Sequence, residues 1–377
     1  MKRIFAFVFT LCLLLCGCGK NEDPYPTKSP KPAGTTAATT EATAPETTQP
    51  ETEPQETEPQ VTEPVAELYR HPLTGEVLGE EYSGRVVTVV INNLRDALPH
   101  YGVSQADLYF EAETEGGITR CLAVFGDVAG VGTVGPIRSS RTFFNNISQA
   151  YDAVLFHCGG SVRGRNGYSG ADGGKISGWE HVDATYVESP YYFRDMDRYN
   201  YQGYNWEHTL FTTGEGMAKA LEKYDYSTPR ALNSGLAFSE EVQLEGEAAR
   251  KVTVVFRGGK TTEFTYDATS GLYCASQYGK EYVDAGNNQR MAFSNVITLY
   301  TSQVFHHDGE YSRSYYELVG EGSGHLAIDG QLVAVKWSRE ALESPFVFTL
   351  EDGTPVTLKT GKTYIAVTSN ENIKAEA

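Results

Sequence analysis

The stretch from residue 107 to residue 141 constrains the fold more than any other part of the chain. Residues 107–113 alternate between apolar and polar side chains, which predicts a half-buried strand. Gly116 and Gly117 then break the strand. Residues 118–126 are richer in apolar side chains, and this predicts a second, more central strand.

Three arginines lie in this stretch and suggest a binding site. Arg120 begins the second strand, whereas Arg138 and Arg141 precede an expected helix from about residue 141 to residue 150. Guanidinium groups beside the free N–H groups of a helix start make an anion site. Whether the three side chains converge does not follow from the sequence.

Buried arginines need anions, because an unpaired buried charge costs several kcal/mol. Two sources stay open: carboxylates of this chain, with Asp107, Glu111 and Glu115 nearest in sequence, and an anionic ligand that competes with them or adds to them. Asn92 and Asn93, which end a strand expected at residues 85–91, are expected to supply neutral donors. The candidate ligand-binding residues are Arg120, Arg138, Arg141, Asn92, Asn93, Asp107, Glu115 and His157.

Several short motifs carry a family resemblance. They are HPLTGE at 71–76, VVINN at 89–93, SQAD at 104–107, EGGITR at 115–120, VGPIRSSR at 134–141, YDA at 151–153 and HCGGS at 157–161. Together these motifs resemble the YerB-like lipoproteins, a bacterial family of two domains with no assigned biochemical role. The resemblance runs from about residue 70 to about residue 368 and is weaker in the second half. It implies a lipid anchor and a two-domain layout, but no reaction.

The N-terminus has the pattern of a lipoprotein signal. Met1-Lys2-Arg3 precedes an apolar run from Ile4 to Leu15, which is too short for a stable membrane span. Leu15-Cys16-Gly17-Cys18 follows as a lipobox. We therefore predict a signal peptide at residues 1–17 and acylation, such as by palmitate, at Cys18; an ordinary secretory signal is the alternative. The expected location is the outer face of the cytoplasmic membrane, held by the lipid.

The segment from Cys18 to residue 66 is rich in Thr, Pro and Glu and has almost no apolar side chain to bury. This composition predicts a disordered tether. The whole chain carries a net charge of −18, and its pI is near 4.9. Such acidity argues against nucleic acid as the partner, although a local basic pocket for a cell-wall or other anionic envelope ligand is still allowed.

The rest of the chain is expected to form two domains. Residues 67–235 predict an α+β or α/β domain, which ends with a helix near residues 214–224. Residues 240–377 read as strands separated by turns, which predicts a mostly β domain built as an antiparallel sheet or small barrel. The polar segment 229–247 marks the boundary.

Two further segments lie in the first domain. Residues 159–178 form a glycine-rich loop, but Gly174-Lys175 is followed by Ile176 rather than Ser or Thr, so it is not a phosphate-binding P-loop. Residues 186–206 are dense in aromatic side chains. They suit a carbohydrate- or peptide-facing surface, or else they pack over the sheet edge as ordinary core.

The function best supported is a binding or assembly lipoprotein of the cell envelope. The alternative is an enzyme acting on an anionic envelope substrate, either a hydrolase or a phosphotransferase like the LytR–CpsA–Psr proteins, which share the order of the arginines. Arg120-Cys121-Leu122 lacks the Asp and Thr of their motif, and no Gly-x-Ser-x-Gly elbow is present. Catalytic residues therefore stay unassigned. We expect neither a cofactor nor a metal, since His306-His307-Asp308 has no further ligand at a suitable spacing.

Overall fold

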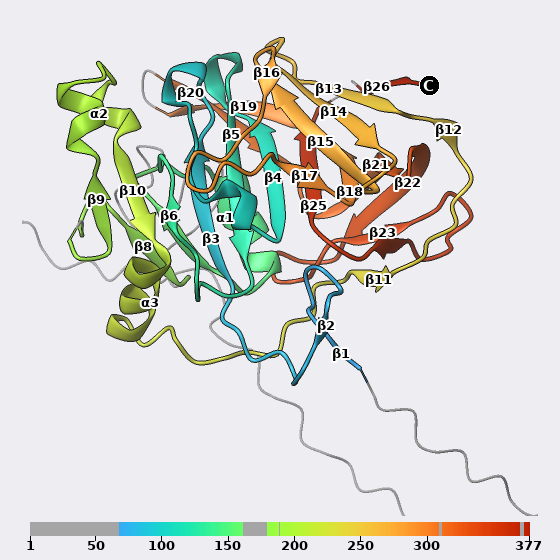
Figure 1. Cartoon of the computed structure of the whole chain (residues 1–377), viewed down its shortest axis with the longest axis horizontal. Coiled ribbons are helices and arrows are strands. Elements are labelled where there is room, and N and C mark those ends of the chain that lie inside the picture. The colour runs from blue at the N-terminus through green and yellow to red at the C-terminus, as the bar shows by residue number, and fades with distance from the viewer. Residues whose placement is uncertain (1–67, 161–178, 188, 309–310, 370–372) are drawn as a thin grey trace, which may run out of the picture. The chain divides into compact units, whose positions relative to one another are not determined.

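The computed structural model describes residues 68–160, 179–187, 189–308, 311–369 and 373–377 (Figure 1). The predicted signal peptide, Cys18, the tether and most of the glycine-rich loop lie outside the described residues. Residues 65–377 group into one compact unit, in which strands from both predicted domains take part.

An 11-stranded sheet dominates the described part of the chain. In order across it, the strands are β12 (Glu247–Ala248), β22 (Gln331–Arg339), β21 (Gly320–Ile328), β18 (Asn295–Tyr300), β25 (Thr363–Thr368), β4 (Leu108–Glu113), β5 (Thr119–Phe125), β3 (Val87–Asn92), β7 (Val154–His157) and β8 (His181–Asp183), with β23 (Val347–Thr349) paired to β22. The strands expected near residues 107–113 and 118–126 are therefore confirmed as β4 and β5, which pair antiparallel at the centre.

The two predicted domains meet inside this sheet. Strand β25, from the C-terminal part, runs parallel to β4, from the N-terminal part, with Ile365 opposite Phe110. Strand β18 is parallel to β25 in turn. The strand-rich character expected of the second part is confirmed. The expectation of an antiparallel sheet or small barrel did not include the parallel pair of β18 and β25 within that part. Parallel pairing needs long connections, and these are hard to infer from strand patterns alone.

A second, six-stranded sheet belongs to the C-terminal part. Its strands are β16 (Lys280–Glu281), β15 (Leu272–Gln277), β14 (Thr261–Asp267), β13 (Lys251–Val255) and β26 (Ile373–Glu376), with β17 (Ala292–Phe293) paired to β15. Residues on β13 and β14 alternate between buried and more exposed side chains, as in a sheet that covers a core with one face.

Shorter elements complete the unit. The helices are α1 (Thr142–Ala150), α2 (Met196–Asn200) and α3 (Gly214–Lys223), with 3₁₀ turns at Arg95–Ala97, Val103–Gln105, Glu115–Gly117 and Trp206–His208. The remaining strands are β1 (Tyr69–Arg70) with β2 (Val77–Leu78), β6 (Thr133–Val134) with β10 (Leu210–Thr213) and β9 (Tyr192–Arg194), β11 (Ala237–Ser239) with β24 (Thr357–Lys359), and β19 (Gln303–Asp308) with β20 (Tyr311–Tyr316). Helices α1 and α3 lie where the sequence predicts them.

Alternate residues of β4 and β5 enter two different cores, because successive side chains of a strand point to opposite faces. On one face, Phe110 and Leu122 pack with residues of α1. On the other face, Tyr109 and Ala123 pack with residues of the six-stranded sheet. The main sheet is thus covered on both faces at its centre.

This double cover corrects the expectation that β4 is half-buried. Its polar face was expected to be solvated, yet Glu111 is only 2% exposed and Glu113 only 4%. The six-stranded sheet supplies the partners: Lys260 and Thr262 bond to Glu111, and the Gly258 N–H donates to Glu113. The alternation in the sequence correctly identifies which side chains lie on the polar face of the strand. It does not show whether that face is covered by another part of the protein or by water.

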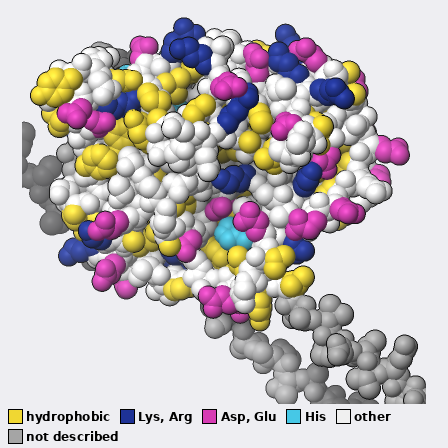
Figure 2. Space-filling view, viewed as in Figure 1, with side chains coloured by type: hydrophobic (Ala, Val, Ile, Leu, Met, Phe, Trp, Pro, Cys, Tyr) yellow, Lys and Arg dark blue, Asp and Glu magenta, His cyan; other side chains and the backbone are white. Residues whose placement is uncertain are grey.

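The aromatic segment at residues 186–206 divides between core and surface. Tyr192 is buried against Phe156, whereas Tyr201 is 83% exposed. Trp206 also lies at the surface, where the guanidinium of Arg194 stacks 4.1 Å from its ring centroid. In Figure 2, hydrophobic side chains gather at the surface over α2, at the upper left of the view. Neither interpretation of this segment therefore describes all of it.

Candidate arginine site

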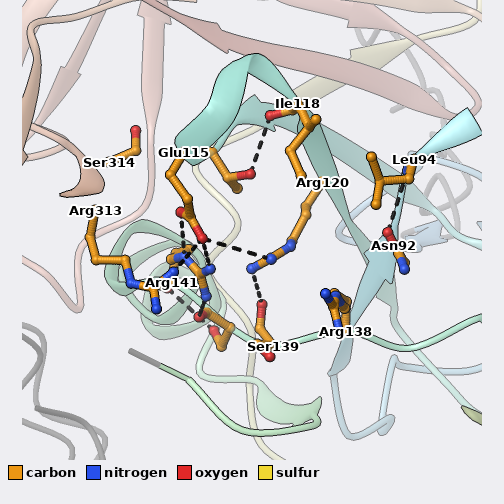
Figure 3. Close-up of polar contacts among 12 residues, drawn as sticks. Asn92, Leu94, Glu115, Ile118, Arg120, Arg138, Ser139, Arg141, Arg313 and Ser314 are labelled. Atoms are coloured by element: carbon orange, nitrogen blue, oxygen red, sulfur yellow. Dashed lines mark hydrogen bonds and ion pairs between the residues drawn. The ribbon is translucent and has the colours of Figure 1, made fainter. Parts of the chain in front are cut away.

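Four elements bring arginines and one glutamate together (Figure 3). Glu115 lies in the 3₁₀ turn between β4 and β5, Arg120 lies on β5, Arg141 begins α1, and Arg313 comes from β20. The turn depends on glycine, because Gly116 and Gly117 have φ values of 75° and 71°. The tight connection places the Glu115 side chain beside the start of β5.

The Glu115 carboxylate accepts hydrogen bonds from two arginines. Arg141 donates Nε–H to Oε2 at 2.9 Å and Nη2–H to Oε1, a two-point contact that fixes both planes. Arg313 donates Nη1–H to Oε1 at 2.5 Å. Arg120 lies farther away, with Nη2 4.0 Å from Oε1, and it donates Nη1–H to the Ser139 carbonyl at 2.7 Å.

Positive charge exceeds negative charge in this cluster. Within the described part of the chain, Arg120 and Arg141 share the carboxylate of Glu115, and Arg313 also contacts this carboxylate. Arg120 is 4% exposed, and its Nε–H has no hydrogen-bond partner among the described residues. Burial lowers the pKa of Arg120, and the neighbouring charge of Arg141 lowers it further, although the Glu115 charge acts in the opposite direction. The buried guanidinium groups of Arg120 and Arg141 therefore carry more positive charge than the Glu115 carboxylate neutralises.

Burial would raise the pKa of Glu115, but the hydrogen bond and charge of Arg141, together with the charge of Arg120, outweigh it and lower the pKa to about 2. Glu115 is therefore ionised throughout the physiological range. The Glu115 side chain is 22% exposed, so solvent reaches part of it.

Arg138 lies at the edge of the cluster. Its Nη2–H donates to Glu207 at 2.7 Å, and its side chain is 26% exposed. The positive charge of Arg138 is close enough to help lower the pKa of Arg120. Figure 3 shows Arg138 between Arg120 and Asn92, on the side of the cluster away from Arg313. All three predicted arginines are thus brought to one region, but only Arg120 and Arg141 contact Glu115.

Helix α1 begins at the cluster without a side-chain cap. Its N-cap residue is Arg141, whose side chain makes no capping hydrogen bond. Neither neighbouring hydroxyl caps the helix: the Ser140 hydroxyl donates to Asn145 Oδ1, and Thr142 is the first helical residue. A helix start carries partial positive charge, which adds to that of the arginines.

The other candidate residues are not part of the cluster. Asn92 donates Nδ2–H to His208 Nδ1 at 2.9 Å, and its Oδ1 accepts from the Leu94 N–H. Asn93 donates to Glu111 and Thr119, on the opposite face of the sheet. Asn93 therefore faces away from the arginines, whereas Asn92 lies opposite Arg120 in the β3–β5 register and bonds to His208 and Leu94.

Asp107 and His157 also lie elsewhere. Asp107 accepts a hydrogen bond from the Gly126 N–H at 2.6 Å. His157, on β7, contacts the Gly159 carbonyl through Nδ1 and His181 through Nε2, at 2.8 and 3.1 Å. Of the three carboxylates proposed as internal partners, Glu115 is the one that pairs with the arginines.

Sequence reasoning missed Arg313, which lies almost 200 residues beyond Glu115. It lies on β20, far along the chain from the turn that carries Glu115. Lys260 was missed for a similar reason: it follows the Gly258-Gly259 turn and is 9% exposed, yet it neutralises the buried Glu111. Neither contact has a local signal in the sequence.

Comparison with known proteins places the chain in a family. Residues 73–227 match the model described as "Protein of unknown function (DUF3048) N-terminal domain", and residues 252–365 match the corresponding C-terminal domain. The chain therefore belongs to the DUF3048 family. The two matches divide it into N- and C-terminal family domains, even though strands of both lie in one sheet.

A related sequence and a solved structure, both described as YerB of Bacillus subtilis, agree with this assignment. The chain is 26% identical over 307 residues to "Putative lipoprotein YerB" of Bacillus subtilis (strain 168), covering 80% of this chain and 87% of the relative. The crystal structure of the YerB protein from Bacillus subtilis matches with a TM-score of 0.68 and 25% identity, covering 82% of this chain and 99% of that one. The resemblance to YerB-like proteins predicted from the motifs is confirmed.

The described residues contain neither a membrane-spanning helix nor a cluster of metal ligands. No helix there has the length and apolar character needed to span a membrane. No group of three or more His, Cys, Asp or Glu side chains in the described ranges is arranged to hold a metal ion.

Proposed function

We propose that this protein is a lipid-anchored cell-envelope protein that binds an anionic group at the cluster of Arg120, Arg138, Arg141 and Arg313. The observation that carries the proposal is that two buried guanidinium groups, those of Arg120 and Arg141, share the carboxylate of Glu115, while the Nε–H of Arg120 has no hydrogen-bond partner among the described residues. Repulsion among like charges with so little neutralisation is costly, and a bound anion would relieve it.

The anchor is inferred from the N-terminus and from the family. Cys18 ends a lipobox after a short apolar segment, and the Bacillus subtilis relative is named a lipoprotein. Two or three acyl chains are enough to hold a protein on a membrane, since each buried CH₂ contributes about 0.8 kcal/mol. The Pro/Thr/Glu-rich segment that follows would then space the family domains from the membrane surface.

Glu115 serves as the internal anion of the resting site. It holds Arg141 and Arg313 in place, so their guanidinium groups need little further ordering when a ligand arrives. The Nε–H of Arg120 has no hydrogen-bond partner in the described ranges, and Arg138 is partly exposed. Arg120 and Arg138 are therefore the side chains best able to bind a ligand while Glu115 stays in place.

The chemistry favours a multi-oxygen anion. Guanidinium groups match phosphate and carboxylate oxygens through paired hydrogen bonds, and the uncapped start of α1 adds N–H donors that suit phosphate. A phosphate or pyrophosphate group is the anion that uses both kinds of donor. In an envelope protein, such a group would belong to an anionic polymer or a lipid-linked intermediate.

Thermal unfolding of the full-length chain, purified in detergent, tests the proposal with inorganic pyrophosphate as the probe. We expect the Tm to rise with pyrophosphate concentration by the mass-action relation. Arg138→Gln should weaken this rise at least tenfold in apparent affinity. Arg230→Gln is the matched control, because Arg230 is exposed and pairs with Asp152 and Glu180 outside the cluster.

The proposal fails if pyrophosphate stabilises the parent no more than sodium chloride of equal ionic strength. It also fails if Arg138→Gln and Arg230→Gln reduce the stabilisation equally, since that pattern indicates general charge screening.

A further inference from the structure

A cavity lies on the side of the main sheet that faces the six-stranded sheet. It has a volume of about 490 Å³ and is formed by the loop at residues 95–99 and the hairpin of β15 and β16. This volume is in the range of small-molecule sites. Leu98, Pro99 and Val283 supply apolar walls. Because Arg120 shares its strand face with Leu122 on the α1 side, the arginine cluster and this cavity lie on opposite faces of the sheet.

The hairpin at the cavity has an unusual turn. Tyr278 and Gly279 link β15 to β16 with φ values of 54° and 73°, the conformation of a two-residue turn that normally carries Asn-Gly. A tyrosine at positive φ is uncommon and strained. Its hydroxyl donates to the Asn93 carbonyl at 2.6 Å, and the Arg95 guanidinium lies 5.2 Å from its ring centroid. The strained residue thus holds Arg95 at the mouth of the cavity.

The cavity is lined by an excess of positive charge. Arg95 and Lys280 are exposed, and neither has a carboxylate within ion-pair distance in the described part of the chain. Glu281 also lines the cavity, but it is paired with Arg290 at 2.8 Å. In a protein with a net charge of −18, two unpaired cations at one cavity favour a small anion. The planar guanidinium of Arg95 is suited to a carboxylate.

Gln277 gives the cavity a second kind of polar group. It is 4% exposed, and neither its Oε1 nor its Nε2 has a hydrogen-bond partner among the described residues. A buried amide without partners is costly, and most buried polar groups are satisfied. A ligand that reaches this wall of the cavity and carries an amide of its own would offer Gln277 both an acceptor and a donor.

We propose that this cavity binds the C-terminal end of a short peptide. Its carboxylate would bind Arg95 and Lys280, its last amide would bind Gln277, and its side chain would contact Leu98 and Pro99. The apolar walls and the amide distinguish this ligand from the phosphate-like anion proposed for the arginine cluster. The proposal goes beyond that function and does not depend on it.

Equilibrium dialysis of the full-length chain in detergent tests the proposal. The probe is a mixture of twenty acetyl-alanyl dipeptides that differ in the last residue, with retained peptides identified by mass spectrometry. We expect one or more free acids to be retained, and the matching C-terminal carboxamides to be retained at least tenfold less. Arg95→Gln and Gln277→Leu should each reduce retention at least tenfold, whereas Arg138→Gln, in the other cluster, should leave it unchanged.

Arg95 is exposed, so Arg95→Gln is expected to fold and is a valid test even if Gln277→Leu does not. The proposal is overturned if no dipeptide acid is retained, if carboxamides are retained equally, or if Arg95→Gln binds as the parent does. Loss of binding in Arg138→Gln would also overturn it, since the ligand would then belong to the arginine cluster.

Discussion

Arg141 and Glu115 form a two-point ion pair across the start of α1, with the Arg141 side chain 3% exposed. The pair joins the β4–β5 turn to the helix, and Arg313 brings the β20 hairpin to the same carboxylate. One glutamate therefore organises three cations from distant parts of the chain. Loss of the negative charge of Glu115 should therefore change both the stability of the fold and the affinity for anions.

Acid should weaken the fold through Glu115. Its pKa is about 2 in the folded protein and near 4.5 when unfolded. A carboxyl with a lowered folded pKa stabilises the protein above pH 4.5, and this contribution is lost as the pH falls from 4.5 to 2. The full contribution is about 3 kcal/mol. Urea unfolding across this pH range should show a shallower slope for Glu115→Gln than for the parent; parallel slopes would contradict the assignment.

A second acid response should come from His100, which is buried between the Asn92 carbonyl and Tyr282. Its Nε2–H donates to that carbonyl at 2.8 Å, and its Nδ1 accepts from the Tyr282 hydroxyl at 2.6 Å. Burial lowers the pKa of His100 to about 4. The unfolded chain therefore binds the proton first, and stability should fall as the pH drops from 6.5 to 4.

The His100 contribution reaches about 3 kcal/mol at its limit. Comparison of His100→Gln with the parent by urea unfolding at pH 7 and pH 5 measures it. The loss of stability between these two pH values should be smaller in the variant. An equal loss in both proteins would show that His100 does not carry this response, leaving other histidines such as the half-buried His181, whose pKa burial also lowers to about 4.

The buried pair of Lys260 and Glu111 should be sensitive to removal of one partner. The two side chains are 5% and 2% exposed, and Thr119 and Tyr364 also bond to Glu111. Lys260→Met leaves the carboxylate without its counter-charge and should destabilise the fold by about 3–5 kcal/mol. The double variant Lys260→Met with Glu111→Gln should be less destabilised than the single one. If the double variant is worse, the pair is not coupled as the structure indicates.

The lipid anchor has its own test. Cys18→Ala should move the protein from the membrane fraction to the soluble fraction or the medium when cells are fractionated, because the acylated residue is gone. Ser83→Ala, within the family domains, is the control for handling and expression. A Cys18→Ala chain that stays in the membrane fraction would show that the lipid is not the anchor.

Much of the secondary structure could be predicted because its signals are local. The apolar runs of β3, β5 and β25 and the amphipathic pattern of α3 fix the type of element without knowledge of its neighbours. What could not be predicted is what covers each face. Glu111 was assigned to a solvated side because the sequence gives no indication that Lys260 lies against it.

The arginine site shows the same division. The clustering of Arg120, Arg138 and Arg141 follows from a turn, a strand and a helix start that are close in sequence. The choice of Glu115 over Asp107 depends on the two-glycine turn, and the presence of Arg313 depends on how β20 packs against it. These contacts depend on packing between segments that are far apart in the sequence, and a short motif does not predict such packing.

In the proposed site, Glu115 occupies a position that an external anion can share or take over. The most direct measurement is the stabilisation by pyrophosphate of Glu115→Gln compared with the parent, by urea unfolding at pH 7. The variant lacks the internal anion, so its apparent affinity for pyrophosphate should be at least tenfold higher, and saturating pyrophosphate should restore part of the lost stability. A Glu115→Gln protein that folds but gains no more from pyrophosphate than the parent would contradict the account.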